Sequence, residues 1–256
     1  MQLYTIDFES IYQDQSWIQS TQNVCMKLKD LPLHGINGFC SEESQEILLN
    51  HCSHIQTPSL VFSGSGNYHY LSLFLLNRIK TPFSLILFDH HSDMQIGPSN
   101  DMLSCGNWVD FVLRENPYLK QLFIIGISKQ YVPKNYGDFG KEIFFFTDEE
   151  VKKRGWLEQL NSAIQFPLYI SIDKDVFSQE FVHTNWDQGS MNQQEIQMFF
   201  EKVALKHQMI GGDICGECSK DFINPDYYID QQLNGKMNEY LMDCFQSYSQ
   251  KLIQHH

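Results

Sequence analysis

The chain has 256 residues, and its 31 acidic residues outnumber its 18 lysines and arginines to give a formal net charge of −13. A chain this acidic repels phosphate groups, so we expect no nucleic acid partner. The hydrophobic fraction of 42% excludes a disordered chain, and no apolar run approaches the roughly 18 residues of a membrane-spanning helix, which argues against a membrane protein.

Short apolar runs alternate with longer amphipathic stretches along the sequence. Runs such as SLILF and LFIIGI are apolar on both faces, which is typical of parallel strands covered by helices on both sides. The expected strands are Leu3–Phe8, Leu60–Ser63, Ser84–Asp89, Leu122–Ile127, Glu142–Phe146, Leu168–Asp173 and Met209–Ile214. The expected helices are one that begins after Ser41, then Tyr70–Arg78, Asn107–Glu115, Trp156–Ile164, Gln193–Lys206 and Lys236–Ile253. Tyr12–Gly38 has no assignable pattern, and the alternation elsewhere predicts a single α/β domain over residues 1–256.

Cysteine use and the first residues of the chain indicate a cytoplasmic protein. Seven cysteines are an odd number, which argues against a disulfide framework and favours a reducing compartment. Cys215 and Cys218 form one C-x-x-C pair, which we interpret as plain thiols, with a redox pair as the alternative. Met1–Gln15 lacks the features of a signal peptide, and His255 and His256 are either natural residues or a tag remnant, to which we assign no function.

Polar residues follow four of the expected strands at the same end. The segments are LVFSGSGNYHY, LILFDHHSDMQ, LYISIDKDVFS and MIGGDICGEC. Ligands bind beyond the carboxyl ends of the strands in an open parallel sheet, so we expect these segments to meet at one rim. The residues that they bring to this rim are His69, Asp89, His91, Asp93, Asp173, Asp175, Asp213 and Glu217.

The spacing of these acids predicts a metal centre. Extended residues alternate sides, so the acids of DHHSD and of DKD should each share a face, with His90, Ser92 and Lys174 turned away. Four carboxylates around one point repel one another unless cations compensate them. Oxygen donors with some imidazole favour Mn²⁺ or a similar hard ion, and six donors suit two ions about 3.5–4 Å apart. We interpret the remaining histidines as ordinary surface or core groups: His34, His51, His54 and His207.

These motifs resemble those of the arginase/agmatinase (ureohydrolase) family. The family patterns D-x-H-x-D and S-x-D-x-D have their counterparts here in Asp89, His91 and Asp93, and in Ser171, Asp173 and Asp175. The family's Gly-rich segment with a metal-binding histidine is similar to Gly64–His69, and the resemblance covers about residues 58 to 220. It implies a three-layer α/β/α fold around an eight-stranded, mostly parallel sheet.

The resemblance also implies a centre of two Mn²⁺ ions per chain, with a bridging hydroxide that attacks the guanidinium carbon of a small cationic substrate. Family members form trimers or hexamers, so it implies a homo-oligomer as well. The implied ligand sets are Asp89 and Asp173 bridging both ions, His69 and Asp93 on one ion, and His91 and Asp175 on the other. Asp93 is also expected to accept the hydroxide's proton, and Glu217 to hold the substrate cation.

Several substrate-facing positions depart from the family pattern. Ser178 and Gln179 stand where the family continues with D-P, and Asn107 and Trp108 occupy the region of a proton-shuttle histidine. His183 in a later loop is the expected replacement for that histidine. We therefore expect hydrolysis of a C–N bond in a guanidino, formimino or related cationic substrate rather than arginase activity.

Three other functions compete with this one. A histone-deacetylase-like amide hydrolase would use one zinc ion and a His–His pair, which His90 and His91 imitate. A phosphoesterase with an Asp-His-His motif would need an earlier D-x-D strand end and suits an acidic chain poorly. A catalytically idle relative that binds metal or a cationic ligand is favoured by the missing shuttle histidine.

Overall fold

A computed structural model describes residues 1–26, 28, 31–95, 102–153, 155–220 and 225–254, so His255 and His256 lie outside the described residues. Its main strands are β1 (Gln2–Ile6), β2 (Asn23–Met26), β4 (Ser59–Phe62), β5 (Phe83–Phe88), β7 (Leu119–Ile127), β8 (Glu142–Thr147), β9 (Leu168–Asp173) and β10 (Met209–Cys215). These eight strands form one sheet in the order β2-β1-β4-β10-β9-β5-β7-β8, and every pairing between them is parallel. Two shorter strands, β3 (Phe39–Cys40) and β6 (Leu103–Ser104), pair antiparallel outside this sheet.

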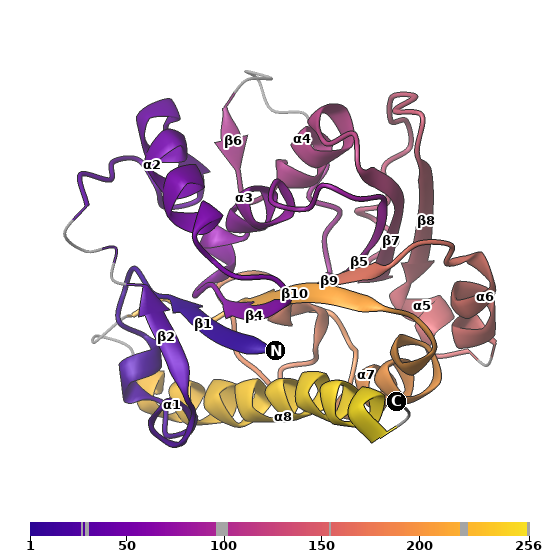
Figure 1. Ribbon diagram of the computed structural model, residues 1–256. Helices are drawn as coiled ribbons and strands as arrows, with labels where there is room; N and C mark the ends of the chain where they lie inside the picture. Colours follow the sequence, from indigo (N-terminus) through magenta and orange to yellow (C-terminus); the bar gives the residue numbers. More distant parts are fainter. Residues whose placement is uncertain (27, 29–30, 96–101, 154, 221–224, 255–256) are drawn as a thin grey trace.

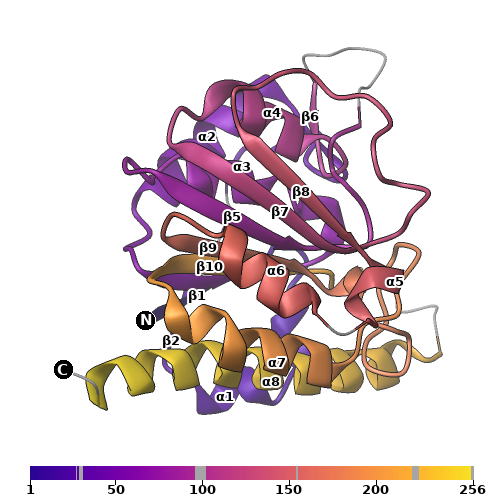
Figure 2. The ribbon, with the colours of Figure 1, turned by 90° about the vertical axis from the view of Figure 1, so that its right-hand side faces the viewer.

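Helices cover both faces of the sheet, as Figures 1 and 2 show. One face carries α2 (Glu42–Ser53), α3 (Leu71–Leu76) and α4 (Trp108–Glu115). The other carries α1 (Trp17–Ser20), α5 (Asp148–Val151), α6 (Trp156–Ala163), α7 (Gln193–Lys202) and α8 (Tyr227–Gln254). Short 3-10 turns are η1 (Tyr12–Asp14), η2 (Gly66–Tyr68), η3 (Lys174–Val176) and η4 (Ala204–Lys206). The expected three-layer fold around an eight-stranded parallel sheet is thus confirmed.

The apolar runs form strands because they are buried on both sides. All six residues of β5 and of β9 are buried, and each face of the sheet packs its own cluster of aliphatic and aromatic side chains against the helices. Parallel sheets are covered by helices on both faces, because the helices that connect successive strands lie above and below the sheet. No helix among the described residues is long and apolar enough to cross a membrane.

The structure adds to the sequence analysis in the first part of the chain and corrects it at the last helix. The unassigned stretch Tyr12–Gly38 contains the edge strand β2, whose four residues are exposed or half-buried and therefore lack an apolar signal. The last helix begins at Tyr227 rather than Lys236, although Gly235 would normally weaken a helix interior. Gly235 faces the side chain of Gln15, which precedes α1.

We predict that Ile86→Ala lowers the free energy of unfolding by about 2–5 kcal/mol. Ile86 is fully buried in β5, which pairs with β7 on one side and β9 on the other, so the truncation leaves a cavity at the centre of the sheet. Leu49→Ala on α2, where the side chain is 43% exposed, is the control and should change stability by less than about 0.5 kcal/mol. Urea unfolding followed by circular dichroism measures both, and equal losses would contradict the assignment of the core.

Candidate metal centre

Four neighbouring strands place the candidate ligands at one rim of the sheet. β4, β10, β9 and β5 lie side by side, and the segment that follows each of them runs over the same carboxyl edge. The chain continues from β5 to β7 on one side and from β9 to β10 on the other, and such a reversal between neighbouring strands opens a binding crevice in α/β sheets. The structure brings together all six residues expected to bind metal: His69, Asp89, His91, Asp93, Asp173 and Asp175.

His69 faces three carboxylates with one ring nitrogen. Its Nδ1 atom lies 3.0 Å from Asp93 Oδ2, 3.4 Å from Asp89 Oδ2 and 3.4 Å from Asp173 Oδ2. The other nitrogen, Nε2, lies 3.1 Å from the hydroxyl of Ser171, which itself donates to Asp213. Because Ser171 has one hydrogen and gives it to Asp213, it accepts from His69 Nε2–H. Nδ1 is therefore the nitrogen that faces the carboxylates, and its lone pair would be available to a metal ion once Nδ1 loses its proton.

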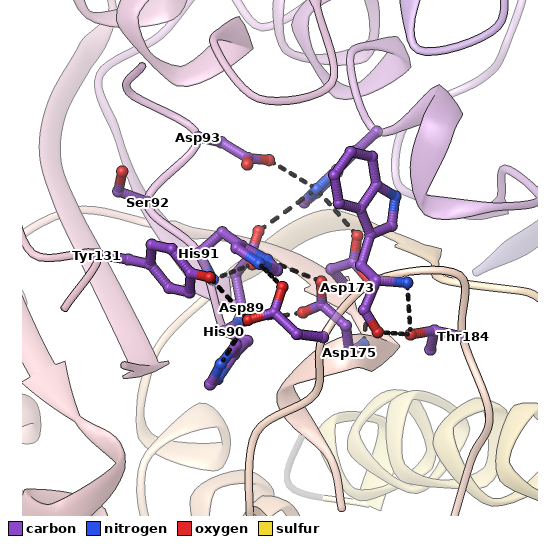
Figure 3. Close-up of polar contacts among 12 residues, drawn as sticks. Asp89, His90, His91, Ser92, Asp93, Tyr131, Asp173, Asp175 and Thr184 are labelled. Atoms are coloured by element: carbon purple, nitrogen blue, oxygen red, sulfur yellow. Dashed lines mark hydrogen bonds and ion pairs between the residues drawn. The ribbon is translucent and has the colours of Figure 1, made fainter. Parts of the chain in front are cut away.

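A second group forms around His91. Its Nδ1 atom lies 2.9 Å from Asp175 Oδ2 and 3.5 Å from Asp89 Oδ1. Figure 3 shows His91 beside these two acids. Asp89 therefore faces His69 with one carboxylate oxygen and His91 with the other. A carboxylate shared in this way is the geometry that a residue bridging two ions requires.

The buried charges of this cluster need a compensating cation. Asp89 Oδ2 is buried and has no hydrogen-bond partner. Burial raises the pKa of Asp89 well above its usual range, and the charges of Asp93, Asp175 and Asp173 raise it further. Burial, with the charge of Asp175, raises the pKa of Asp173 to about 6. Burial alone lowers the pKa of His69, but Asp93 outweighs it through a hydrogen bond and its charge, and with Asp173 and Asp89 raises that pKa to about 10. Once they release their protons, these oxygen and imidazole donors fit divalent cations.

The backbone that aims these side chains is not extended, which corrects the alternation argument. β5 ends at Phe88, so Asp89 to Asp93 lie in the loop that follows it, and Asp93 has a left-handed backbone with φ of 50°. Asp175 lies in the 3-10 turn η3, where its backbone N–H donates to Asp173 Oδ1 at 3.0 Å. The acids converge because the two loops curl over the rim, and the strained φ of Asp93 is typical of functional sites.

The cluster lies at the floor of a cavity of about 290 Å³. Asp89, His91, Asp93, Asp173 and Asp175 line it, and Gly66 contributes backbone beside Asp173. Three large apolar side chains that also line the cavity are well exposed: Phe39 at 55%, Met102 at 52% and Trp186 at 43%. A ligand would therefore meet an acidic floor and an apolar rim.

Three residues that support the cluster were not anticipated from the sequence. Trp108 donates from Nε1 to Asp93 Oδ2 at 2.6 Å and places its ring against His69. Asp187 lies 2.9 Å from His91 Nε2 and also accepts from the Tyr131 hydroxyl at 2.7 Å. These partners come from distant segments without a motif of their own, so only the folded chain reveals them.

The structure does not place Glu217 in the cavity. Its carboxylate is fully buried and ion-paired with Lys174, which points away from the acids as expected from the sequence. Asn238 donates to the same oxygen at 2.6 Å, and Gln15 donates to the other at 2.9 Å. Glu217 therefore braces the turn that carries Asp173 and Asp175, and it has no free oxygen directed at a substrate.

His183 also lies away from the cavity. Its Nδ1 atom contacts Asp230 Oδ1, its backbone N–H donates to Asn234, and its side chain is about 41% exposed. It does not take the place of the missing shuttle histidine in this conformation. Asn107, at the corresponding place in the cavity wall, uses its side chain to hold Ser104 N and Met102 O. Among the described residues of the cavity lining, His91 is the one histidine.

Comparisons with known proteins agree with the fold and with the motifs. A family model described as the arginase family matches residues 17–220, which is most of the chain. An uncharacterized protein of Thermotoga maritima is 27% identical over 219 residues, covering 84% of this chain and 79% of that protein. The proclavaminate amidino hydrolase of Streptomyces clavuligerus has a TM-score of 0.66 at 17% identity, covering 95% of this chain and 91% of its own.

Two further solved structures share the fold. The arginase of Bacillus subtilis has a TM-score of 0.63 at 14% identity and covers 94% of this chain and 98% of its own. The formimidoylglutamase of Bacillus subtilis has a TM-score of 0.59 at 14% identity, with coverages of 92% and 86%. At these identities the structural likeness shows a common fold and does not select among their substrates.

We predict that Lys174→Met lowers the free energy of unfolding by about 3–5 kcal/mol, because it leaves the buried carboxylate of Glu217 without its counter-charge. Adding Glu217→Gln to this variant should recover much of that loss, since the neutral amide needs no counter-ion. Urea unfolding of the two single variants and the double variant measures the coupling. Additive losses would show that Glu217 is not paired with Lys174, and would reopen its role at the substrate.

Proposed function

We propose a function for this protein, which belongs to the arginase family. It is a metal-dependent hydrolase of C–N bonds in a small guanidino, formimino or related cationic substrate. The observation that carries the proposal is the pair of histidine–carboxylate groups that share Asp89 at the floor of the cavity. One group contains His69 and Asp93, and the other contains His91 and Asp175. Two such groups suit two cations better than the single zinc ion of the deacetylase alternative.

Two Mn²⁺ ions are the proposed cofactors. The donors in both groups are mainly carboxylate oxygens with one imidazole each, the combination that hard divalent ions prefer. In this assignment Asp89 would hold both ions, because its two oxygens face His69 and His91, and Asp173, beside His69, would be the second shared ligand. Two such ions supply an activated water near neutral pH.

The protein's own residues would position the reactants. Trp108 donates to Asp93 Oδ2 and fixes that carboxylate's orientation, which leaves Oδ1 as the oxygen available to accept a proton from the attacking water. Asp187 orients His91 through Nε2, so that Nδ1 keeps facing the cluster. Two divalent ions would change the formal charge from −13 to about −9, and an acidic protein still attracts a cationic substrate.

A binding protein without catalysis is the second candidate. It is favoured by the cavity lining, where neither His183 nor Asn107 offers a free proton donor for a leaving amine. This candidate predicts the same metal content as the enzyme. Only turnover separates the two.

We predict that Asp89→Ala abolishes binding of both ions, because the residue contributes an oxygen to each group. His91→Ala should keep one ion, since the group around His69 stays intact. Metal content per chain after loading with Mn²⁺ and gel filtration, measured by elemental analysis, distinguishes zero, one and two ions. Asp138→Ala, which removes an exposed carboxylate outside the cluster, is the control and should keep both ions. An Asp89→Ala protein that retains two ions would contradict the bridging role.

We predict that the Mn²⁺-loaded protein hydrolyses at least one small cation whose carbon is bonded to two or more nitrogens. The experiment screens guanidino, formimino and acyl-amine compounds for released ammonia, amine or urea. Substrates with an apolar segment beside the cation should be preferred, because Phe39, Met102 and Trp186 line the cavity and are exposed. Turnover should disappear in Asp89→Ala and persist in Asp138→Ala. A fully loaded protein that turns over none of these compounds supports the binding protein instead.

A further inference from the structure

Cys215 is the last residue of β10 and points into the candidate metal centre. Its side chain is fully buried, and Sγ lies 3.1 Å from Asp173 Oδ2, the same oxygen that lies 3.4 Å from His69 Nδ1. The chain turns immediately afterwards at Gly216, with φ of 91°. A side chain at Gly216 would come within 2.5 Å of Asp173 Oδ1, so glycine is what lets the end of β10 approach this carboxylate.

The thiol completes a third group of potential ligand atoms. One atom each from His69, Asp173 and Cys215 lies within 4.8 Å of the others. Ligands bound at about 2.0–2.3 Å from a common ion lie no more than about 4.5 Å apart, so the group needs little adjustment to share an ion. The buried Asp89 Oδ2, 3.4 Å from His69 Nδ1, has no hydrogen-bond partner. This unpartnered carboxylate oxygen beside the group is independent evidence that a cation belongs here.

The two cysteines of the C-x-x-C pair have different surroundings. Cys218 Sγ donates to the backbone oxygen of His183 at 2.8 Å, outside the three ligand groups. Cys105 lines the cavity but also falls outside those groups. Of the seven cysteines, all of which the structure describes as free, Cys215 alone belongs to a group of potential metal ligands among the described residues.

We propose that Cys215 is a thiolate ligand of the ion held by His69, which makes the two metal positions chemically unequal. Thiolate sulfur favours zinc and similar ions, whereas the group of Asp89, His91 and Asp175 offers only oxygen and imidazole and keeps the preference for manganese. On binding, the Cys215 thiol loses its proton to solvent, and the Sγ–metal bond replaces its hydrogen bond to Asp173. This inference rests on the proposed metal centre and refines which ions occupy it.

Titration of the metal-free protein with Co²⁺ tests the inference by absorption spectroscopy. A thiolate bound to Co²⁺ gives a sulfur-to-metal charge-transfer band in the near ultraviolet, which oxygen and imidazole ligands do not give. The native protein should show this band, and both Cys215→Ser and Cys215→Ala should lose it. The controls Cys218→Ser and Cys105→Ser should keep it. With zinc and manganese offered together, Cys215→Ser should lower the ratio of bound zinc to bound manganese at least about tenfold. Mutating a residue that only supports a metal ligand already costs about tenfold in affinity, so losing a ligand should cost no less.

The outcomes separate the inference from the proposed function. Two bound Co²⁺ ions per native chain without a charge-transfer band would overturn the role of Cys215 and leave the binuclear centre in place. A band that survives in Cys215→Ser and disappears in Cys105→Ser would assign the sulfur to the other cavity cysteine. Absence of Co²⁺ binding would overturn the metal centre itself, and with it this inference. Retention of one ion in Cys215→Ser would show that this variant is folded.

Discussion

Mutual repulsion among four buried carboxylates is the constraint on which this structure depends. Asp89, Asp93, Asp173 and Asp175 converge from two loops at the rim of one sheet, and the two histidines between them cannot neutralise them all. The protein holds the acids in place through supports outside the cluster, including the Trp108 indole and the hydroxyl of Ser171 behind His69. Binding of cations to such a site would be favourable because it relieves the repulsion between the carboxylates.

The sequence predicts the parts of the molecule that depend on local pattern. Apolar runs buried on both faces locate the central strands, with β9 matching Leu168–Asp173 at both ends, whereas the half-exposed edge strand β2 leaves no such signal. The motifs also identify all six residues that the structure clusters, although alternation along a strand is the wrong reason for the clustering. The backbone conformation of the loops, including the left-handed Asp93, sets where these side chains point. The spacing of residues in the motifs does not encode that conformation.

The structure places Glu217 and His183 away from the cavity, and the physical reason is a different one. Glu217 has the type and the position expected of a substrate-binding acid, but its buried partner Lys174 lies 43 residues earlier and neutralises it. The same kind of distant pairing ties His183 to Asp230. Charge complementarity between segments far apart in the chain decides whether an acid faces a ligand or the protein interior, and one sequence carries no mark of that choice.

The position of Asn238 in the sequence determines when it is synthesised relative to the clustered acids. This residue belongs to α8, the last helix in the chain, and it joins Gln15 in holding Glu217 behind the turn that carries Asp173 and Asp175. Synthesis from the amino end delivers all six acids and imidazoles before it delivers α8. A growing chain therefore carries these six residues before it carries the Asn238 amide that helps to hold Glu217 behind the second acid turn.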